Sequence, residues 1–444
     1  MSKRDKWILL IIVMFVCGIY TACDIYLYTS GIDFYQFWGV GKVHNLSSGA
    51  LKSPYNEMHK YAAMIDDLAH SSDDLRIRLA NQINHRFYKE GIDLIGTPLI
   101  FSIFALMPQN YSLAYGIYEL TLLFSFISGC LLIFLLHNNK WCIFSLLALL
   151  LTINYAPFIA DLTVGNISSI QFLLFTLITS LIKFTLKNSQ YKHNYIISSV
   201  IMCSLVFLLL LKPNMLILVL LLSASIWSLQ GAAVFTVSSA IASLFGVALI
   251  YLSGEYFDSP AIWLDWLNVF SRGSEKLSYP ISNGNFSAVQ IISQFFDVRV
   301  NVTILSVFSI LSLITLLVLF KTIDANYTVF RGLFKSTVSV LKEPFLCSAI
   351  GVTLTLAISP LVWVQYNVIL LLPALWFILD SRPWSITELS AILSILMSSG
   401  TLSKILQSNV LEPYFIAFGW VPILVCIWVG IIEINNKTET LIAN

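Results

Sequence analysis

Charged residues are scarce in this chain. Only 11% of its 444 residues are Asp, Glu, Lys or Arg, while 57% are hydrophobic. A soluble globular domain carries roughly 25% charged residues, so the composition excludes that class. The formal net charge is only +1, which gives no reason to expect nucleic acid as a partner. Repeated apolar runs between short polar stretches instead predict an all-α, polytopic helical membrane protein surrounded by membrane lipids.

Cysteine pairs and cofactor motifs are also missing from the sequence. The seven cysteines all fall inside apolar runs, without a CxxC spacing: Cys17, Cys23, Cys130, Cys142, Cys203, Cys347 and Cys426. They are typical of small core residues, and they predict neither a disulfide framework nor a zinc site. Walker, GxGxxG and HExxH motifs are lacking too, so we expect no cofactor.

The apolar runs predict about 12 membrane spans, since one span needs roughly 20 residues. The predicted spans are 7–28, 112–136, 141–160, 167–186, 195–211, 214–229, 232–252, 302–320, 345–360, 366–379, 385–402 and 413–432. The first follows a short basic stretch but is too long for a cleavable signal, so we expect it to remain attached. The short run 94–107 is interpreted as a re-entrant or interfacial helix.

Lys and Arg cluster on the side of the amino terminus, which the positive-inside rule makes cytoplasmic. Two long segments, about 29–111 and 253–300, then face outward. The first predicts three amphipathic helices, beginning near Phe34, at Pro54 and near Ser72. The earliest of these is expected to lie on the membrane surface. Residues 1–444 are interpreted as one integral-membrane domain.

Asp33 lies directly after the first apolar segment and is surrounded by aromatic residues. A carboxylate at the edge of the hydrocarbon core is costly unless it has a partner or a function. One interpretation is an interfacial helix cap. The other is a catalytic base that faces a substrate embedded in the membrane.

Four further polar motifs map to the same outer face: 161–166, 211–214, 283–287 and 359–366. Each alone is ordinary turn chemistry, and Lys212 alone is compatible with snorkelling to the headgroups. Because all four share a face with Asp33, we predict a common outer cavity with one cation, one carboxylate and several amides. That set suits a sugar attached to a phosphate.

In order along the chain, these motifs resemble those of the integral-membrane C-class glycosyltransferases, specifically the family 87 branch that uses polyprenyl-phosphate sugars to transfer mannose or arabinose. The matching stretches are Asp33-Phe34-Tyr35 in the first loop, Gly165-Asn166-Ile167-Ser168, Lys212-Pro213, Gly284-Asn285-Phe286-Ser287 and Ser359-Pro360-Leu361-Val362-Trp363-Val364-Gln365. The chain departs from the family where both amide positions of Gly-Gln-x-Asn are changed, where Phe286 replaces glutamine and where Gln365 replaces histidine.

The resemblance implies an inverting glycosyltransferase on the extracytoplasmic face of a bacterial plasma membrane. The donor would be mannose, or another hexose or pentose, on a polyprenyl phosphate, and the acceptor a lipid or glycan. Asp33 would be the general base and Lys212 would hold the phosphate. The implied substrate-binding candidates are Tyr35, Asn166, Asn214, Asn285 and Gln365, and no metal is implied.

Two alternatives stay open at this point. One is a transporter or flippase that moves a lipid-linked sugar without chemistry. The polar residues gather at one face and no repeat of two halves is visible, which favours the enzyme. The other is an inactive relative, because several motif positions are altered.

Overall fold

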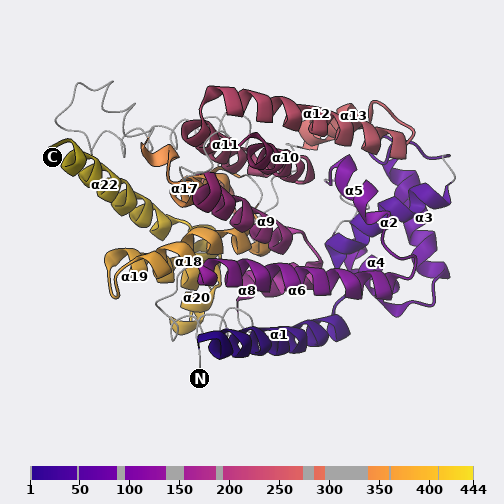
Figure 1. Cartoon of the computed structure of the whole chain (residues 1–444). Coiled ribbons are helices and arrows are strands. Elements are labelled where there is room, and N and C mark those ends of the chain that lie inside the picture. Colours follow the sequence, from indigo (N-terminus) through magenta and orange to yellow (C-terminus); the bar gives the residue numbers. More distant parts are fainter. Residues whose placement is uncertain are drawn as a thin grey trace.

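The computed structural model describes residues 3–47, 50–87, 96–136, 155–186, 194–273, 285–295, 339–359, 362–408 and 410–443. Every regular element within these ranges is helical, which confirms the predicted all-α class. Long helices run side by side across the molecule, and a group of shorter ones, α2 to α5, gathers at one end (Figure 1). The start of α1 and the end of α22 both lie toward the opposite end.

The bundle is built from pairs of packed helices. α1 (Lys3–Tyr28) and α9 (Ser168–Leu181) both pack on α6 (Tyr111–Leu135), and α10 (Tyr195–Leu211) packs along α12 (Ala232–Tyr256). α11 (Leu216–Gln230) lies against α17 (Pro344–Ile358), and α19 (Ile386–Ser398) lies between α18 (Leu371–Asp380) and α22 (Val421–Ala443).

Shorter elements join these helices. They are α8 (Ala156–Val164), the π-helix η1 (Ile182–Leu186), η3 (Pro213–Met215), α13 (Ile262–Gly273), α14 (Ala288–Phe295), η5 (Val364–Leu370), α20 (Thr401–Ile405) and α21 (Glu412–Ala417). Several carry proline at their first or second position, because proline lacks the N–H that has no helical partner in the first turn. α8 and η3 are examples, and both adjoin the candidate site described below.

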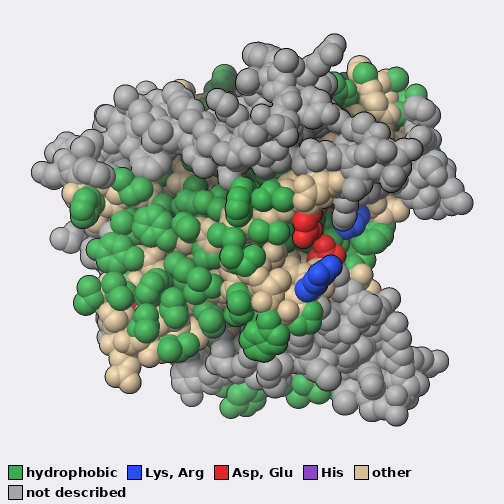
Figure 2. Space-filling view, turned by 90° about the vertical axis from the view of Figure 1, so that its left-hand side faces the viewer, with side chains coloured by type: hydrophobic (Ala, Val, Ile, Leu, Met, Phe, Trp, Pro, Cys, Tyr) green, Lys and Arg blue, Asp and Glu red, His purple; other side chains and the backbone are tan. Residues whose placement is uncertain are grey.

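Within the described ranges, five stretches are long and apolar enough to cross a membrane: Tyr111–Leu135, Ser168–Thr185, Pro213–Gln230, Ala232–Tyr256 and Glu412–Ile434. Ile11–Leu27 and Ile32–Leu46 pass the same test together but meet at a bend of 70°, and they make a sixth if counted as one broken span. Hydrophobic side chains cover most of the described part of the face in Figure 2, with charged side chains at one side. These features are compatible with a membrane protein.

The count of 12 spans stays a prediction. Four predicted spans correspond to apolar helices of 10–17 residues: Tyr195–Leu211, Pro344–Ile358, Val364–Asp380 and Ile386–Ser398. The predicted span 302–320 and most of 141–160 lie outside the described residues. The run 94–107 contains α5 (Pro98–Phe104), whose seven residues are too few to cross a bilayer.

The first outer segment forms a packed cap on the bundle. It comprises α2 (Ile32–Leu46), α3 (Met58–Ser71), α4 (Leu75–Phe87) and α5. α2 is buried on nearly all sides, including the polar Gln36, Lys42 and His44, so its polar face is not turned to solvent as an amphipathic surface helix would require. That the helix lies at the membrane surface stays a prediction. α3, α4 and α5 pack on α2, and the polar side chains of α2 are buried together with its apolar ones.

The other two predicted outer helices exist with small corrections. α3 begins at Met58, not at Pro54, because residues 54–56 form a turn. α4 begins where expected, after Asp74, and it is amphipathic: Leu75 at its start is exposed, while Ile77 and Ala80 are buried.

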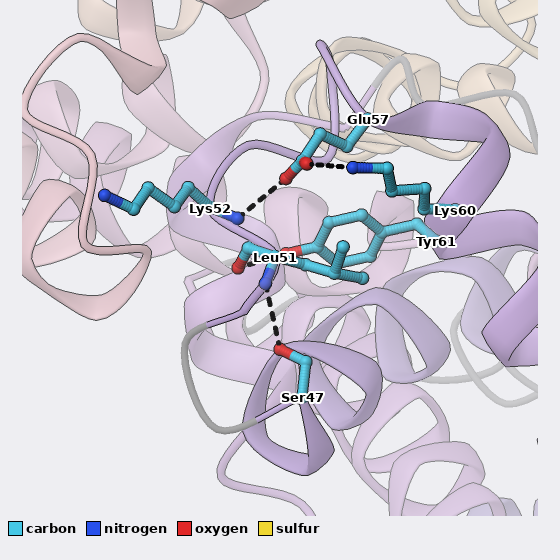
Figure 3. A network of polar contacts seen from close by, with 6 residues as sticks. All are labelled: Ser47, Leu51, Lys52, Glu57, Lys60 and Tyr61. Atoms are coloured by element: carbon cyan, nitrogen blue, oxygen red, sulfur yellow. Dashed lines mark hydrogen bonds and ion pairs between the residues drawn. The ribbon is translucent and has the colours of Figure 1, made fainter.

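The connection between α2 and α3 is held by the contacts in Figure 3. Glu57 accepts a hydrogen bond from the Lys52 amide at 2.9 Å and pairs with Lys60 Nζ, also at 2.9 Å. The Tyr61 hydroxyl lies 3.0 Å from His44 Nδ1 and is fully buried. These contacts fix where α3 begins relative to α2.

α2 and α5 approach each other so closely that only glycine fits at one position. A Cβ added at Gly41 would stand 2.8 Å from the Cα of Ala105. Beside it, the buried Lys42 Nζ donates to the Ala105 carbonyl at 2.9 Å and to the Met107 carbonyl. Lysine thereby satisfies carbonyls that the end of the short helix α5 leaves without helical partners.

We expect Gly41→Ala to lower the thermal stability, because its new methyl group meets backbone atoms that cannot rotate away. Overpacking of this kind typically costs about 1–3 kcal/mol. Thermal unfolding in detergent, followed by circular dichroism, measures the effect. Gly39→Ala is the matched control on the same helix, since its Cβ would meet only the flexible Ile65 side chain at 3.2 Å. Equal losses in the two variants would contradict the close approach.

Candidate functional site

Three breaks between helices position the residues of the candidate site. At the first, Gly31 adopts a left-handed conformation, with φ 65°, between the end of α1 and the start of α2 at Ile32. Asp33 therefore stands in the first turn of α2, where the positive end of the helix dipole favours a carboxylate. Its side chain is half-buried.

The second break lies between α8 and α9. Gly165 ends α8 with φ 68°, and its amide donates to the Asp161 carbonyl at 2.9 Å. This is the usual helix ending at a left-handed glycine. A Cβ at Gly165 would stand 2.6 Å from that of Phe34, so the turn also brings α8 against the start of α2. Asn166, the next residue, is thereby directed at Asp33.

The third break lies between α10 and α11. Proline disfavours helical conformation in the preceding residue, and Lys212 is accordingly extended, with φ −150° and ψ 90°. Pro213 then opens the single turn η3, which leads into α11. At this break the half-buried Lys212 side chain reaches Asn166.

One amide connects the carboxylate to the ammonium group. Asn166 Nδ2 donates to Asp33 Oδ2 at 2.6 Å, and Asn166 Oδ1 accepts from Lys212 Nζ at 3.2 Å. Lys212 Nζ also lies 3.6 Å from the centre of the Tyr366 ring, a cation–π contact from η5. We name Asp33, Asn166 and Lys212 the amide-bridged cluster.

Asp161 is a second carboxylate beside this cluster, and sequence analysis did not select it as a site residue. It is fully buried in α8. It accepts hydrogen bonds from the Ser169 amide at 2.7 Å, the Ser169 hydroxyl at 2.6 Å and the Ser168 amide at 3.3 Å. In the sequence, Asp161 stands four residues before Gly165, and this spacing indicates a residue one helical turn before the break.

Three tyrosines of α6, also missed, hold the backbone around two of the breaks. The Tyr111 hydroxyl donates to the Ser30 carbonyl at 2.5 Å, and the Tyr118 hydroxyl donates to the Asn166 carbonyl at 2.8 Å. Between them, the Tyr115 hydroxyl donates to the Leu162 carbonyl at 3.1 Å. Their spacing of four and three residues marks one helical face, and that periodicity was visible in the sequence.

Asn285 acts on the protein backbone near the site. Its Oδ1 accepts from the Val362 amide at 3.0 Å and from the Ser287 amide at 3.1 Å, and its side chain is fully buried. It fastens the segment before α14 to the connection that leads to η5. Because Tyr366 belongs to η5, Asn285 braces the element that contacts Lys212.

The remaining predicted residues lie outside the amide-bridged cluster. Asn214 is exposed in η3. Tyr35 is fully buried, and its hydroxyl lies 3.5 Å from the Ile65 carbonyl of α3, which makes it a packing residue of the cap. Gln365 is buried in η5, next in sequence to Tyr366.

The three charged groups at the helix breaks affect one another's proton affinity. Burial raises the pKa of Asp33 above its ordinary value, while the Asn166 hydrogen bond and the Lys212 charge oppose that rise. Burial also raises the pKa of Asp161, opposed by its contacts with Ser169 and by Lys212. The pKa of Lys212 is lowered by burial, and the two carboxylates partly restore it.

The cluster offers a proton acceptor and a cation separated by one amide. Among the described residues, no three His, Cys, Asp or Glu side chains form a group that would hold a metal ion. The chain matches no protein-family model, no curated protein and no solved structure. Chemical interpretation therefore starts from the geometry of these residues.

We expect Asn166→Ala to raise the pKa of Asp33 further, because the amide donor favours the charged carboxylate and is lost. The titration of the Asp33 carboxyl stretch, isolated by subtracting the infrared spectrum of Asp33→Asn, measures this change. Asn81→Ala is the control, since it removes an amide that donates to Asp66 at 2.5 Å elsewhere in the cap. A midpoint that stays constant or falls in Asn166→Ala would refute the bridge.

Proposed function

We propose that this protein is an integral-membrane glycosyltransferase that moves a sugar from a polyprenyl phosphate to a lipid or glycan acceptor. The observation that carries the proposal is the amide-bridged cluster, in which Asn166 joins Asp33 at 2.6 Å to Lys212 at 3.2 Å. A sugar phosphate needs a base near the attacking hydroxyl and a cation near the leaving phosphate, with hydrogen-bonding groups between them.

The proposed reaction is a single displacement. The acceptor hydroxyl attacks the anomeric carbon as its proton passes to Asp33, and the bond from that carbon to the phosphate oxygen breaks on the opposite face. The departing polyprenyl phosphate keeps the bonding electron pair, and the Lys212 ammonium stabilises its charge. Configuration at the anomeric carbon inverts. Asn166 can orient both Asp33 and Lys212, since it contacts each directly.

The setting of the cluster supports this assignment. The half-buried Asp33 stands in α2 of the cap, and the half-buried Lys212 stands at the end of α10, which contacts α5 of the cap. In the proposed orientation the cap faces the extracytoplasmic side of a bacterial plasma membrane. A lipid-linked donor reaches such a site from the bilayer, and a hydrophilic acceptor reaches it from water. Membership of the C-class, family 87 branch, with mannose or another hexose or pentose as the sugar, belongs to the same proposal.

A transporter of lipid-linked sugar is the second candidate, because the polar residues lie at interrupted helices. The 70° bend between α1 and α2 and the break at Lys212 resemble the discontinuous helices that line transport sites. Purified protein in vesicles separates the two candidates. Release of sugar from the donor supports the enzyme, whereas translocation of intact donor without release supports the transporter.

We expect Lys212→Met to weaken donor binding and to lower turnover while the protein stays folded. Methionine keeps the side-chain length but removes the charge that would hold the phosphate. Binding of a panel of polyprenyl-phosphate sugars, measured together with sugar transfer, tests this. Lys52→Met is the matched control, because Lys52 is exposed in the same outer region. Unchanged donor affinity and turnover in Lys212→Met would leave Lys212 as a snorkelling residue.

We expect Asp33→Asn to lower turnover by roughly 10²–10⁴-fold while donor binding persists, because asparagine keeps the shape but cannot take a proton at neutral pH. Glu57→Gln and Asp67→Asn are controls that should keep most activity, since Glu57 pairs with Lys60 and Asp67 is exposed. Near-wild-type turnover of Asp33→Asn, measured with the same donor and acceptor, would remove Asp33 from the role of base.

A further inference from the structure

Asp161 is held more firmly than its place in a helix requires. Three donors converge on its carboxylate: the amides of Ser168 and Ser169 and the Ser169 hydroxyl, at distances of 2.6–3.3 Å. A carboxylate that accepts several hydrogen bonds in a buried site is stabilised in its charged form. A neutral serine or asparagine would suffice to cap the start of α9, so the charge itself calls for an explanation.

Lys212 is linked to both carboxylates of the site through short contacts. The Ser168 amide donates to Asp161 Oδ1 at 3.3 Å, and the Ser168 hydroxyl donates at 3.4 Å to Asn166 Oδ1, the same oxygen that accepts from Lys212 Nζ at 3.2 Å. Asn166 Nδ2 in turn donates to Asp33 Oδ2 at 2.6 Å. Asp161 of α8 and Asp33 of α2 each raise the pKa of Lys212, against the lowering caused by burial.

Among the described residues, those that contact Lys212 directly are neutral: the Asn166 side chain and the Tyr366 ring. Nearby, Tyr118 of α6 donates to the Asn166 backbone carbonyl, and the hydroxyl of Thr97, which precedes α5, donates to the Leu211 carbonyl at 3.5 Å.

The two carboxylates differ in what they are free to do. Asp33 is half-buried, and its carboxylate accepts a hydrogen bond from Asn166, so part of it is open to a substrate. Asp161 is fully buried, with its oxygens directed at the start of α9. When Asp33 accepts a proton it becomes neutral, and it then no longer supports the positive charge of Lys212. Asp161 is the carboxylate that remains.

We propose that Asp161 is a positioning residue that keeps Lys212 protonated throughout the reaction, so that an anionic leaving group always meets a cation. The inference rests on the proposed function, which supplies the anionic leaving group. The charge state of Lys212 itself can be measured without any substrate. The Asp161 carboxylate also holds the start of α9, next to Asn166, through Ser168 and Ser169.

The sign of the expected pH effect follows from the charges. Removing the Asp161 carboxylate removes a group that favours the ammonium form, so Lys212 should lose its proton at lower pH than in the wild-type protein. Only neutral lysine reacts with acetic anhydride, and its rate of acetylation therefore reports the neutral fraction. Competitive labelling over a pH series, read by mass spectrometry at Lys212, needs no substrate and no activity.

In Asp161→Asn the acetylation rate of Lys212 at pH 7 should rise by roughly an order of magnitude, which corresponds to a fall of about one pKa unit. Asp161→Glu keeps the charge and should stay close to the wild-type rate. Asp67→Asn, which removes an exposed carboxylate of α3, should leave the rate unchanged. Asp161→Ser provides a second neutral variant if the asparagine protein does not fold.

A Lys212 titration in Asp161→Asn or Asp161→Ser that matches the wild type would overturn the inference and leave Asp161 as a structural residue of α9. The same conclusion follows if Asp161→Glu behaves like the neutral variants. With donor and acceptor present, the alkaline limb of the transfer activity should move to lower pH in Asp161→Asn. Failure of the proposed function looks different, since wild-type protein would then transfer no sugar although Lys212 titrates as expected.

Discussion

The structure depends on the cost of placing charge in a poorly solvated interior. Asp33, Asp161 and Lys212 come from three separate helix breaks, and each would be expensive to bury alone. Asn166 reduces that cost by donating to one carboxylate and accepting from the ammonium group. The helices therefore pack in the arrangement that brings these groups within reach, and the tyrosines of α6 hold the backbone at two of the breaks.

The cap on the bundle also buries a charged side chain that is paired with polar groups. α2 carries Lys42 into a buried position, where it finds backbone carbonyls at the end of α5 as partners. Close approach at Gly41 makes that contact possible. α5 in turn lies against α12 and against α10, so the cap is tied to the helix that ends at Leu211, next to Lys212. The rigidity of the candidate site and the fold of the outer segment are thus linked.

The arrangement suits a reaction that needs a proton acceptor and a phosphate-binding cation at two neighbouring positions. Asp33 is half-buried, whereas Asp161 is fully enclosed and accepts hydrogen bonds from three donors, which oppose the rise in its pKa caused by burial. Two acids in different surroundings beside one lysine permit a division of roles, one in the reaction and one in support. That division is the physical basis on which the proposed transferase and the inference about Lys212 both rest.

The sequence alone determined the helical class, most of the long apolar helices, and the helix breaks at Gly31, Gly165 and Pro213, because periodicity, glycine and proline act locally. Tertiary structure decided which polar residues meet. Asn214 and Tyr35 belong to suitable motifs, yet one faces outward and the other packs against α3. α2 became a buried helix because α3, α4 and α5 cover it, and Asp161 joined the site through a turn of α8. Side-chain direction depends on how helices pack around it, and no local pattern encodes that packing.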